Sequence, residues 1–204
     1  MADGRQQGAL ARYAPRMSAV ADDRVRLAEQ PFPGQMGLRV APGSAAAGRV
    51  AEALGAPLPE TPNTVAEAGR RYVMWLGPDE WLVVEPAGAE GGTEAMLAAA
   101  LAGEGAAVDL SANRTALILS GPDARAVLAG CCPLDLHPSA FPAGRCGQTL
   151  LARAQVIIQA AGEPAADGSP SEYAIYVRPS FAAYVAEWLL DGIEGLALDR
   201  NNGV

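Results

Sequence analysis

The chain has 204 residues, of which 50% are hydrophobic and 19% are charged, a length and composition that suit one large domain or two small ones. Its formal net charge is −8, and because the acidic residues are spread along the chain, the average field would repel a phosphate backbone, so nucleic acid is not an expected partner. No apolar run approaches the ~20 residues of a membrane span, and the N-terminus lacks the apolar stretch of a signal peptide. We therefore expect no membrane contact and a soluble, cytoplasmic protein.

The first half of the chain predicts a short series of strands and helices after an N-terminal arm. Hydrophobic periodicity predicts a strand at 37–40, a helix at 44–55, strands at 72–76 and 81–85 around the turn "GPDE", and a helix at 92–103. Gly55 stands where a helix commonly ends in the left-handed conformation. The segment between this first helix and the strand at 72–76 is rich in proline and predicts a connection.

The second half predicts a similar series, reached through a bridging strand at 106–111. Its elements are a strand at 115–120, a helix at 120–130, strands within 148–159 and at 172–177, and a closing helix. We expect Ser120 to cap the first of these helices, with Pro122 in its first turn, and Ser180 to cap the closing helix, which Gly192 would end.

The closing helix carries an apolar stripe. Its members recur at i, i+3, i+4, i+7 and i+8: Phe181, Tyr184, Val185, Trp188 and Leu189. Such a stripe is typical of a helix face that is buried in a core or in a partner interface.

The two series are copies of one pattern. Pro133 follows Pro57, and Pro138 follows Pro62, by 76 residues (133 − 57 and 138 − 62). Each copy reads strand, helix, strand, strand, helix, which predicts an α+β fold of two repeated subdomains. The predicted division is an arm at 1–34, a first repeat at 35–105, a second repeat at 106–193 and a C-terminal tail at 194–204.

The segment from 129 to 147 holds all three cysteines and the only histidine. Zinc needs about four ligands, and the spacing of the candidates, Cys131, Cys132, His137 and Cys146, fits no familiar finger. A nucleophilic serine or cysteine would need His137 as its base. Because the first copy has Ala56 and Thr61 where the second has Cys132 and His137, the segment is interpreted as a connection. We expect no catalytic residue and no metal ligand in this chain.

A short loop in the middle of the chain is bounded by Asp109 and Arg114. Two interpretations stay open: a turn aspartate with an exposed arginine, or a pair that binds a partner or an acidic ligand. These two residues are the weak candidates for cofactor binding.

Several long motifs resemble one known family. "LGAPLPETPNT", "WLGPDEWLVV", "VRPSFAAYVAEWLL" and the stretch 108–152, which includes "RTALILSGPDARAVLAG", are similar to the gamma subunit of heterotetrameric sarcosine oxidase, over about residues 27 to 191. The resemblance implies the folate-binding-like fold of the aminomethyltransferases. "AGRCGQT" also resembles the cysteine signature of a folate-dependent iron-sulfur assembly protein, with Cys146 at the cysteine.

The resemblance implies a noncatalytic subunit within an oxidoreductase that demethylates sarcosine oxidatively to glycine and transfers the one-carbon unit to tetrahydrofolate. It implies alpha, beta and delta subunits as partners, with FAD, FMN, NAD and tetrahydrofolate bound by those partners and no cofactor in this chain. The sequence agrees in one respect, since no G-x-G-x-x-G motif follows any predicted strand.

Four residues are candidates for the partner interface: Trp81, Arg178, Phe181 and Trp188. Two other functions remain open. A free-standing folate-binding one-carbon enzyme would use Asp109 and Arg114, and a thiol-dependent iron-sulfur assembly protein would need Cys146 to be exposed and acidic.

Overall fold

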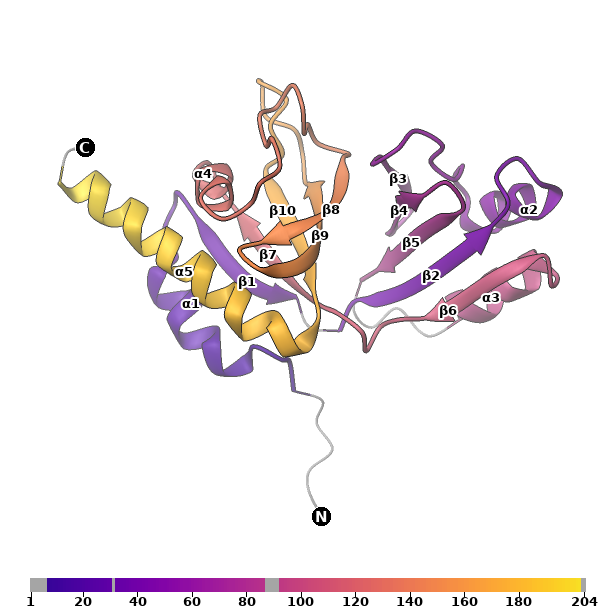
Figure 1. Ribbon diagram of the computed structural model, residues 1–204, viewed down its shortest axis with the longest axis horizontal. Helices are drawn as coiled ribbons and strands as arrows, with labels where there is room; N and C mark the ends of the chain where they lie inside the picture. Colours follow the sequence, from indigo (N-terminus) through magenta and orange to yellow (C-terminus); the bar gives the residue numbers. More distant parts are fainter. Residues whose placement is uncertain (1–6, 31, 87–91, 203–204) are drawn as a thin grey trace, which may run out of the picture. The chain divides into compact units, whose positions relative to one another are not determined.

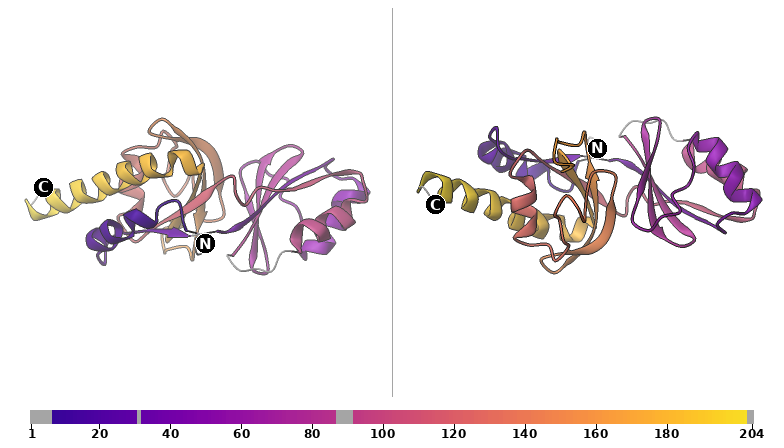
Figure 2. Two further views of the ribbon diagram at one scale, coloured as in Figure 1. Left: turned by 90° about the horizontal axis from the view of Figure 1, so that it is seen from below. Right: turned by 90° about the horizontal axis from the view of Figure 1, so that it is seen from above.

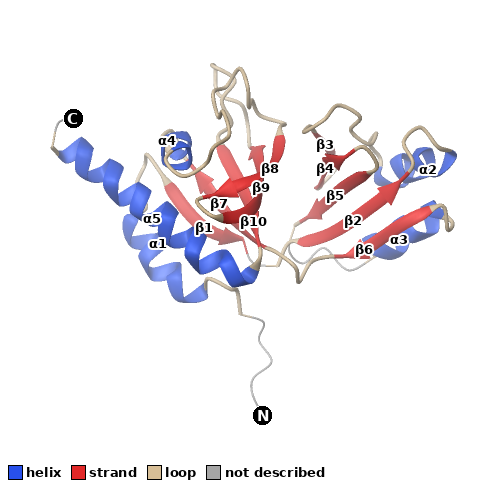
Figure 3. Ribbon diagram, in the orientation of Figure 1, coloured by secondary structure: helices blue, strands red, loops and turns tan. Residues whose placement is uncertain are grey.

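The structure is a computed structural model that describes residues 7–30, 32–86 and 92–202. The chain forms two compact units, each built on one five-stranded antiparallel sheet with helices (Figures 1 and 3). Unit 1 contains the described residues of Met1–Pro31 and of Thr149–Val204, together with Arg114–Ala143; unit 2 contains the described residues of Phe32–Asn113, together with Gly144–Gln148. The architecture confirms the predicted α+β class.

The sheet of unit 2 has the strand order β3-β4-β5-β2-β6. Its strands are β2 (Gly34–Val40), β3 (Val65–Ala68), β4 (Arg71–Gly77), β5 (Glu80–Glu85) and β6 (Gly105–Asp109). The predicted turn "GPDE" does join β4 to β5, where Pro78 and Asp79 supply ordinary turn chemistry.

Two helices of unit 2, α2 (Ala45–Leu54) and α3 (Thr93–Leu101), pack against each other on one face of this sheet (Figure 1). The side chain of Ser44 accepts a hydrogen bond from the backbone N–H of Ala47 and so caps α2, and Gly55 ends it at φ 76°. Apolar side chains of both helices and of the sheet form one core, which includes Leu38, Val50 and Trp81.

The sheet of unit 1 has the strand order β1-β7-β10-β9-β8. Its strands are β1 (Arg26–Gln30), β7 (Thr115–Ser120), β8 (Cys146–Leu151), β9 (Ala154–Ala161) and β10 (Glu172–Val177). Its helical segments are η1 (Ala11–Tyr13), α1 (Ala14–Val20), α4 (Ala124–Ala129) and α5 (Pro179–Asn201).

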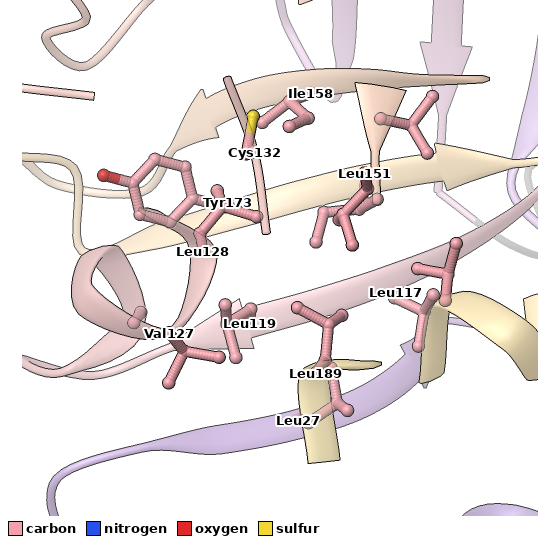
Figure 4. Close-up of a cluster of buried hydrophobic side chains, with 14 of the residues drawn as sticks. Leu27, Leu117, Leu119, Val127, Leu128, Cys132, Leu151, Ile158, Tyr173 and Leu189 are labelled. Carbon is pink, nitrogen blue, oxygen red and sulfur yellow. The ribbon is translucent and has the colours of Figure 1, made fainter. Parts of the chain in front are cut away.

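The core of unit 1 lies between its helices and its sheet. Figure 4 shows Leu117 and Leu119 of β7 close to Val127 of α4 and Leu189 of α5, with the Cys132 thiol at the edge of the cluster. The long helix α5 also contacts α1 and α4, and in Figure 2 it runs beside α1. Among residues 7–30, 32–86 and 92–202, no helix has the length and apolar character that crossing a lipid bilayer requires.

The two units share one topology. Written in the same direction, the sheets read β3-β4-β5-β2-β6 and β8-β9-β10-β7-β1. In each unit the first strand of the repeat, β2 or β7, lies between the last strand of that repeat, β5 or β10, and an edge strand, β6 or β1. The duplicated pattern read from the sequence is therefore present in the chain's architecture. These two edge strands differ in their place in the chain. In unit 2, β6 comes after β2–β5 in the sequence, whereas in unit 1, β1 comes before β7 and belongs to the N-terminal segment.

The N-terminal segment differs from the expected arm. Within its described part, α1 forms and β1 pairs with β7, with Arg26 opposite Ser120 and Gln30 opposite Ala116. The carboxylate of Glu29 accepts hydrogen bonds from the backbone N–H of Leu10 and from the hydroxyl of Thr115. Sequence patterns missed this order because the partners lie far away in the chain. Residues 1–6 and 31 lie outside the described residues.

The ends of two helices also differ from the prediction. Helix α4 begins after Asp123 rather than at Ser120, because Gly121 has φ 105°, a conformation outside that of a right-handed helix. Helix α5 begins after Arg178 rather than Ser180 and continues through Gly192 to Asn201. Its last turns therefore replace the predicted tail, of which residues 203 and 204 lie outside the described residues.

Two further segments have a different role from the one predicted. The proline-rich connection of the first repeat contains β3, which pairs with β4. The strand predicted to bridge the repeats is β6, and it pairs with β2 at the edge of the unit 2 sheet. The prediction that the chain divides at residues 34, 105 and 193 differs from the division into compact units and stays a prediction.

Candidate functional site

Helix α5 has two chemically different apolar faces. It follows Arg178, whose backbone is extended, and Pro179 opens it at a position where a missing N–H costs nothing. One face is buried in the core of unit 1 and consists of small and aliphatic side chains, which are Ala182, Val185, Ala186, Leu189, Leu190 and Ile193. This face holds the helix on the sheet.

The other face carries three exposed aromatic side chains. Phe181, Tyr184 and Trp188 are 47%, 37% and 46% exposed, and their i, i+3, i+7 spacing places them in one row, which we call the α5 ridge. The rings of Tyr184 and Trp188 meet edge to face, with centroids 6.4 Å apart and planes inclined by 68°. A row of exposed aromatic side chains is typical of a protein interaction surface.

An ion-pair cluster fixes the ridge-bearing part of α5 to α1. The guanidinium of Arg16 pairs with Glu187, with Asp191 at 3.1 Å and with Glu194 at 3.1 Å, three residues on one side of α5. These hydrogen bonds, to Glu194 first, raise the pKa of Arg16, and the one from Arg16 lowers the pKa of Glu187. The i, i+4, i+7 spacing of these acidic residues is the feature of the sequence from which a cationic partner could have been predicted.

A second cluster holds the last turn of α5. Arg200 pairs with Asp22 at 2.8 Å and also with Asp123, while Arg24 pairs with Asp123 at 2.5 Å. Hydrogen bonding by Arg24 is the main cause that lowers the pKa of Asp123, and the backbone N–H of Val25 does the same for Asp22. Sequence reasoning missed both clusters because it treated the N-terminal segment as an arm.

The predicted interface residues separate into exposed and buried ones. Arg178, Phe181 and Trp188 are exposed, and the last two belong to the α5 ridge. Trp81 is only 2% exposed, and its indole Nε1 donates a hydrogen bond of 2.8 Å to the carbonyl of Pro59. Trp81 therefore has no exposed ring to offer a partner, whereas Tyr184, which the stripe contained, does.

The two weak candidates for cofactor binding lie in different units. Asp109 ends β6 in unit 2, and its Oδ1 accepts hydrogen bonds from the backbone N–H and the hydroxyl of Ser111, at 2.8 and 2.5 Å. These bonds lower the pKa of Asp109. Arg114 precedes β7 in unit 1 and is half-buried. The described contacts of Asp109 are those of a turn aspartate.

The three cysteines are free thiols. Cys132 and Cys146 are buried and Cys131 is half-buried; burial raises the pKa of Cys131 to about 11 and that of Cys146 to about 12, and it raises the pKa of Cys132 as well. The Cys146 sulfur contacts the carbonyl oxygens of Thr64 and Trp75. An acidic, exposed thiol would have the opposite properties.

His137 lies exposed in the connection after α4, where its Nδ1 is 2.7 Å from the hydroxyl of Ser139. Its backbone N–H donates to Asp135, two residues earlier. Within the described ranges, no group of three or more histidine, cysteine, aspartate or glutamate side chains is arranged to hold a metal ion.

Comparison with known proteins identifies the relatives of this chain. Residues 39–194 match the family described as sarcosine oxidase, gamma subunit family. The sarcosine oxidase subunit gamma of an Arthrobacter species is 42% identical over 175 residues, which cover 85% of this chain and 82% of the relative.

Two solved structures have a similar fold. A chain of the heterotetrameric sarcosine oxidase from Corynebacterium sp. U-96, in complex with pyrrole 2-carboxylate, superposes with a TM-score of 0.81 at 36% identity, covering 93% of this chain and 95% of that one. The glycine cleavage system aminomethyltransferase T from Bartonella henselae has a TM-score of 0.59 at 17% identity, covering 86% of this chain and 48% of that one, and so shares the fold. On the evidence of the family match and of the 42% identity over most of its length, the chain belongs to the sarcosine oxidase gamma subunit family.

Proposed function

We propose that this chain is a noncatalytic gamma subunit that supports assembly of a heterotetrameric sarcosine oxidase. The observation that carries the proposal is the α5 ridge, a row of aromatic side chains that unit 1 leaves exposed on a helix held by ion pairs in its middle and at its last turn. Family membership supports sarcosine oxidase as the complex in question, because the solved structure that superposes with a TM-score of 0.81 is a heterotetrameric sarcosine oxidase.

The chemistry of the chain's own nucleophile candidates supports a noncatalytic role. Thiols with raised pKa values stay protonated near neutral pH, and the protonated form is a poor nucleophile. The imidazole of His137 is hydrogen-bonded within its own loop, to Ser139. The alternative of a thiol-dependent assembly protein finds no support in the buried position of Cys146.

The proposed partners are the alpha, beta and delta subunits. In this proposal they bind FAD, FMN, NAD and tetrahydrofolate and carry out the oxidative demethylation of sarcosine to glycine. The gamma subunit contributes a surface to which these subunits bind. A free-standing folate-binding protein is the alternative, and saturable tetrahydrofolate binding by the isolated chain would favour it.

The exposed area of the ridge indicates its share of an interface. With about 150–250 Å² available for each aromatic side chain, the exposed fractions correspond to roughly 200–330 Å². A specific interface buries about 800 Å² on each partner. The ridge therefore suits the centre of an interface, and Arg178 lies at its N-terminal end where a polar rim would begin.

Copurification tests the proposal. A tagged chain expressed together with the other three subunits should retain them, and Phe181→Ala and Trp188→Ala should each weaken retention, by about tenfold in affinity or more. Leu198→Ala is the matched control, since Leu198 is 61% exposed on the same helix but stands apart from the ridge. Full retention by the Phe181→Ala, Trp188→Ala double variant, or equal loss in the control, would contradict the proposal.

A further inference from the structure

Strand β6 forms an open edge of the unit 2 sheet. It stands last in the order β3-β4-β5-β2-β6, and among the described residues β2 is the strand that pairs with it (Figure 1). The register is regular, from Met36 opposite Asp109 to Val40 opposite Gly105. Such an edge presents a row of unpaired N–H and C=O groups to which another chain can add a strand.

The pairing with β2 shows which backbone groups of β6 face outward. Leu110 directly follows β6, and its N–H donates a hydrogen bond to the carbonyl of Gln35 in β2. Because bonding alternates along an antiparallel pair, Ala106 and Val108 also bond to β2. The backbone groups that point away from the sheet belong to the remaining three residues, Gly105, Ala107 and Asp109.

Two comparable edges are protected against strand addition. At the start of β3, on the opposite side of the same sheet, the N–H of Val65 donates to the carbonyl of Gly144 at 2.9 Å, and Gly144 belongs to unit 2. Strand β1 holds the position of β6 in unit 1 and carries the charged residues Arg26 and Glu29. A covering segment and charged side chains are two usual means of blocking an edge.

Strand β6 has neither form of protection along residues 105–108. This stretch contains no charged residue and no proline, and its side chains are small or β-branched. Val108 is 51% exposed, and four of the five residues of β6 are exposed. A regular, uncharged and exposed edge of this kind is suited to main-chain recognition of an extended segment.

The charge beside the edge distinguishes the possible occupants. Residues 101–113 include two acidic residues, Glu104 and Asp109, and no basic one. Glu104 pairs with Arg49 at 2.7 Å, whereas the described hydrogen bonds of the exposed Asp109 come from Ser111 alone. A second copy of this chain would bring the same acidic residues to the edge, where like charges repel. A strand that carries a basic side chain is complementary.

We propose that β6 binds an extended segment of a partner subunit by main-chain pairing, with small or β-branched residues beside Val108 and a lysine or arginine beside Asp109. The inference rests on the proposed assembly role and adds a contact in unit 2 to it. The α5 ridge supplies roughly 200–330 Å² of the about 800 Å² that a specific interface buries on each partner, so further contacts are needed. Binding is noncovalent and involves no chemical step.

Hydrogen exchange tests the proposal on the full chain, free and in complex with coexpressed alpha, beta and delta subunits. Mass spectrometry with electron-transfer fragmentation follows the single amides. In the free chain the amides of Ala107 and Asp109 should exchange quickly, whereas those of Ala106 and Val108 should exchange slowly because they are bonded to β2. In the complex, exchange at Ala107 and Asp109 should slow by about tenfold or more.

Two substitutions block the edge and leave the bonds to β2 in place. Ala107→Pro removes an outward N–H at a position where an edge strand tolerates proline, and Val108→Lys adds a charge. Each should weaken retention of the partner subunits by about tenfold or more in affinity, while the melting temperature of the free chain stays close to that of the parent. Val108→Thr is the matched control, because it keeps the β-branched shape and adds no charge, and it should retain the partners.

The expected basic residue of the partner has its own test. Asp109→Asn should weaken retention by several-fold and make it less sensitive to salt, since a charge pair is lost. Asp167→Asn is the matched control in unit 1, because Asp167 accepts hydrogen bonds from the N–H and the hydroxyl of Ser169 as Asp109 does from Ser111. It should leave retention unchanged.

The outcomes separate this inference from the assembly role. Unchanged exchange at Ala107 and Asp109 in a complex that does copurify would overturn the inference alone, and so would full retention by both Ala107→Pro and Val108→Lys. A parent chain that retains no partner subunit would overturn both. A dimer of the free chain that Val108→Lys dissociates would assign the edge to a second copy and so overturn the partner segment.

Discussion

Replacing each of two tryptophans by phenylalanine should change the free energy of unfolding by very different amounts, because one ring is buried and the other is exposed. Trp81 is buried in unit 2 and donates a hydrogen bond to the Pro59 carbonyl, whereas Trp188 is about half exposed on α5. In Trp81→Phe, the lost hydrogen bond and the unpaired carbonyl cost about 1–2 kcal/mol. The smaller ring leaves unfilled core volume, which costs about 1–2 kcal/mol more. We therefore expect the free energy of unfolding to fall by about 2–4 kcal/mol.

Urea denaturation followed by far-UV circular dichroism measures this change without depending on tryptophan fluorescence. Trp188→Phe is the matched control and should change the free energy of unfolding by less than about 0.5 kcal/mol, as is usual for exposed sites. A Trp81→Phe variant as stable as the parent chain, or a Trp188→Phe variant that loses as much, would refute the assignment of one ring to the core and the other to the surface.

Three further perturbations test other parts of the structure. The pKa values of Asp22 and Asp123 are lowered in the folded chain, so their contribution to stability is complete above the unfolded-state pKa of about 4 and is lost as the pH falls below it. The melting temperature should therefore drop as the pH falls below about 4. A melting temperature that is unchanged at pH 3 would contradict the ion-pair network. Cys146 should not react with a thiol reagent at neutral pH until the chain unfolds, and rapid labelling of the folded chain would show that it is not buried. Gly121→Ala should lower the free energy of unfolding by more than about 1 kcal/mol, because Gly121 has φ 105° and a Cβ there would lie 2.4 Å from the carbonyl oxygen of Arg24. A Gly121→Ala melting curve that matches the parent would exclude that contact.

The sequence predicted elements whose signals are local. Ser44 and Gly55 mark both ends of α2, and the "GPDE" turn marks the β4–β5 hairpin, because capping and turn chemistry act within a few residues. The stop signal at Gly192 failed for the opposite reason. Partners distant in the chain stabilise the helix beyond it, Arg16 through Glu194 and Asp22 through Arg200. Local propensity is a weak prior where such tertiary contacts exist.

The candidate site shows the same limit. Helical spacing identified the row that contains Phe181 and Trp188, but it could not distinguish that row from the buried Val185 and Leu189 beside it. Trp81 lies in a strand in which five of six residues are buried, so the alternation that marks an exposed face is missing there. Which apolar face is covered depends on the elements packed against it, and these come from elsewhere in the chain.

The origin of β1 has a consequence for the order of events during synthesis. This strand leaves the ribosome first, yet its hydrogen-bonding neighbour begins 85 residues after Gln30 (115 − 30), at Thr115. At about 5–20 residues per second, β1 waits roughly 4–17 s before β7 has even been made. Through that interval the strand that carries Leu27, which is buried in the folded chain, is without its partner, while most of the residues of unit 2 are already available. Unit 1 is therefore the later half to mature and the half more open to chaperones and to mispairing on the way.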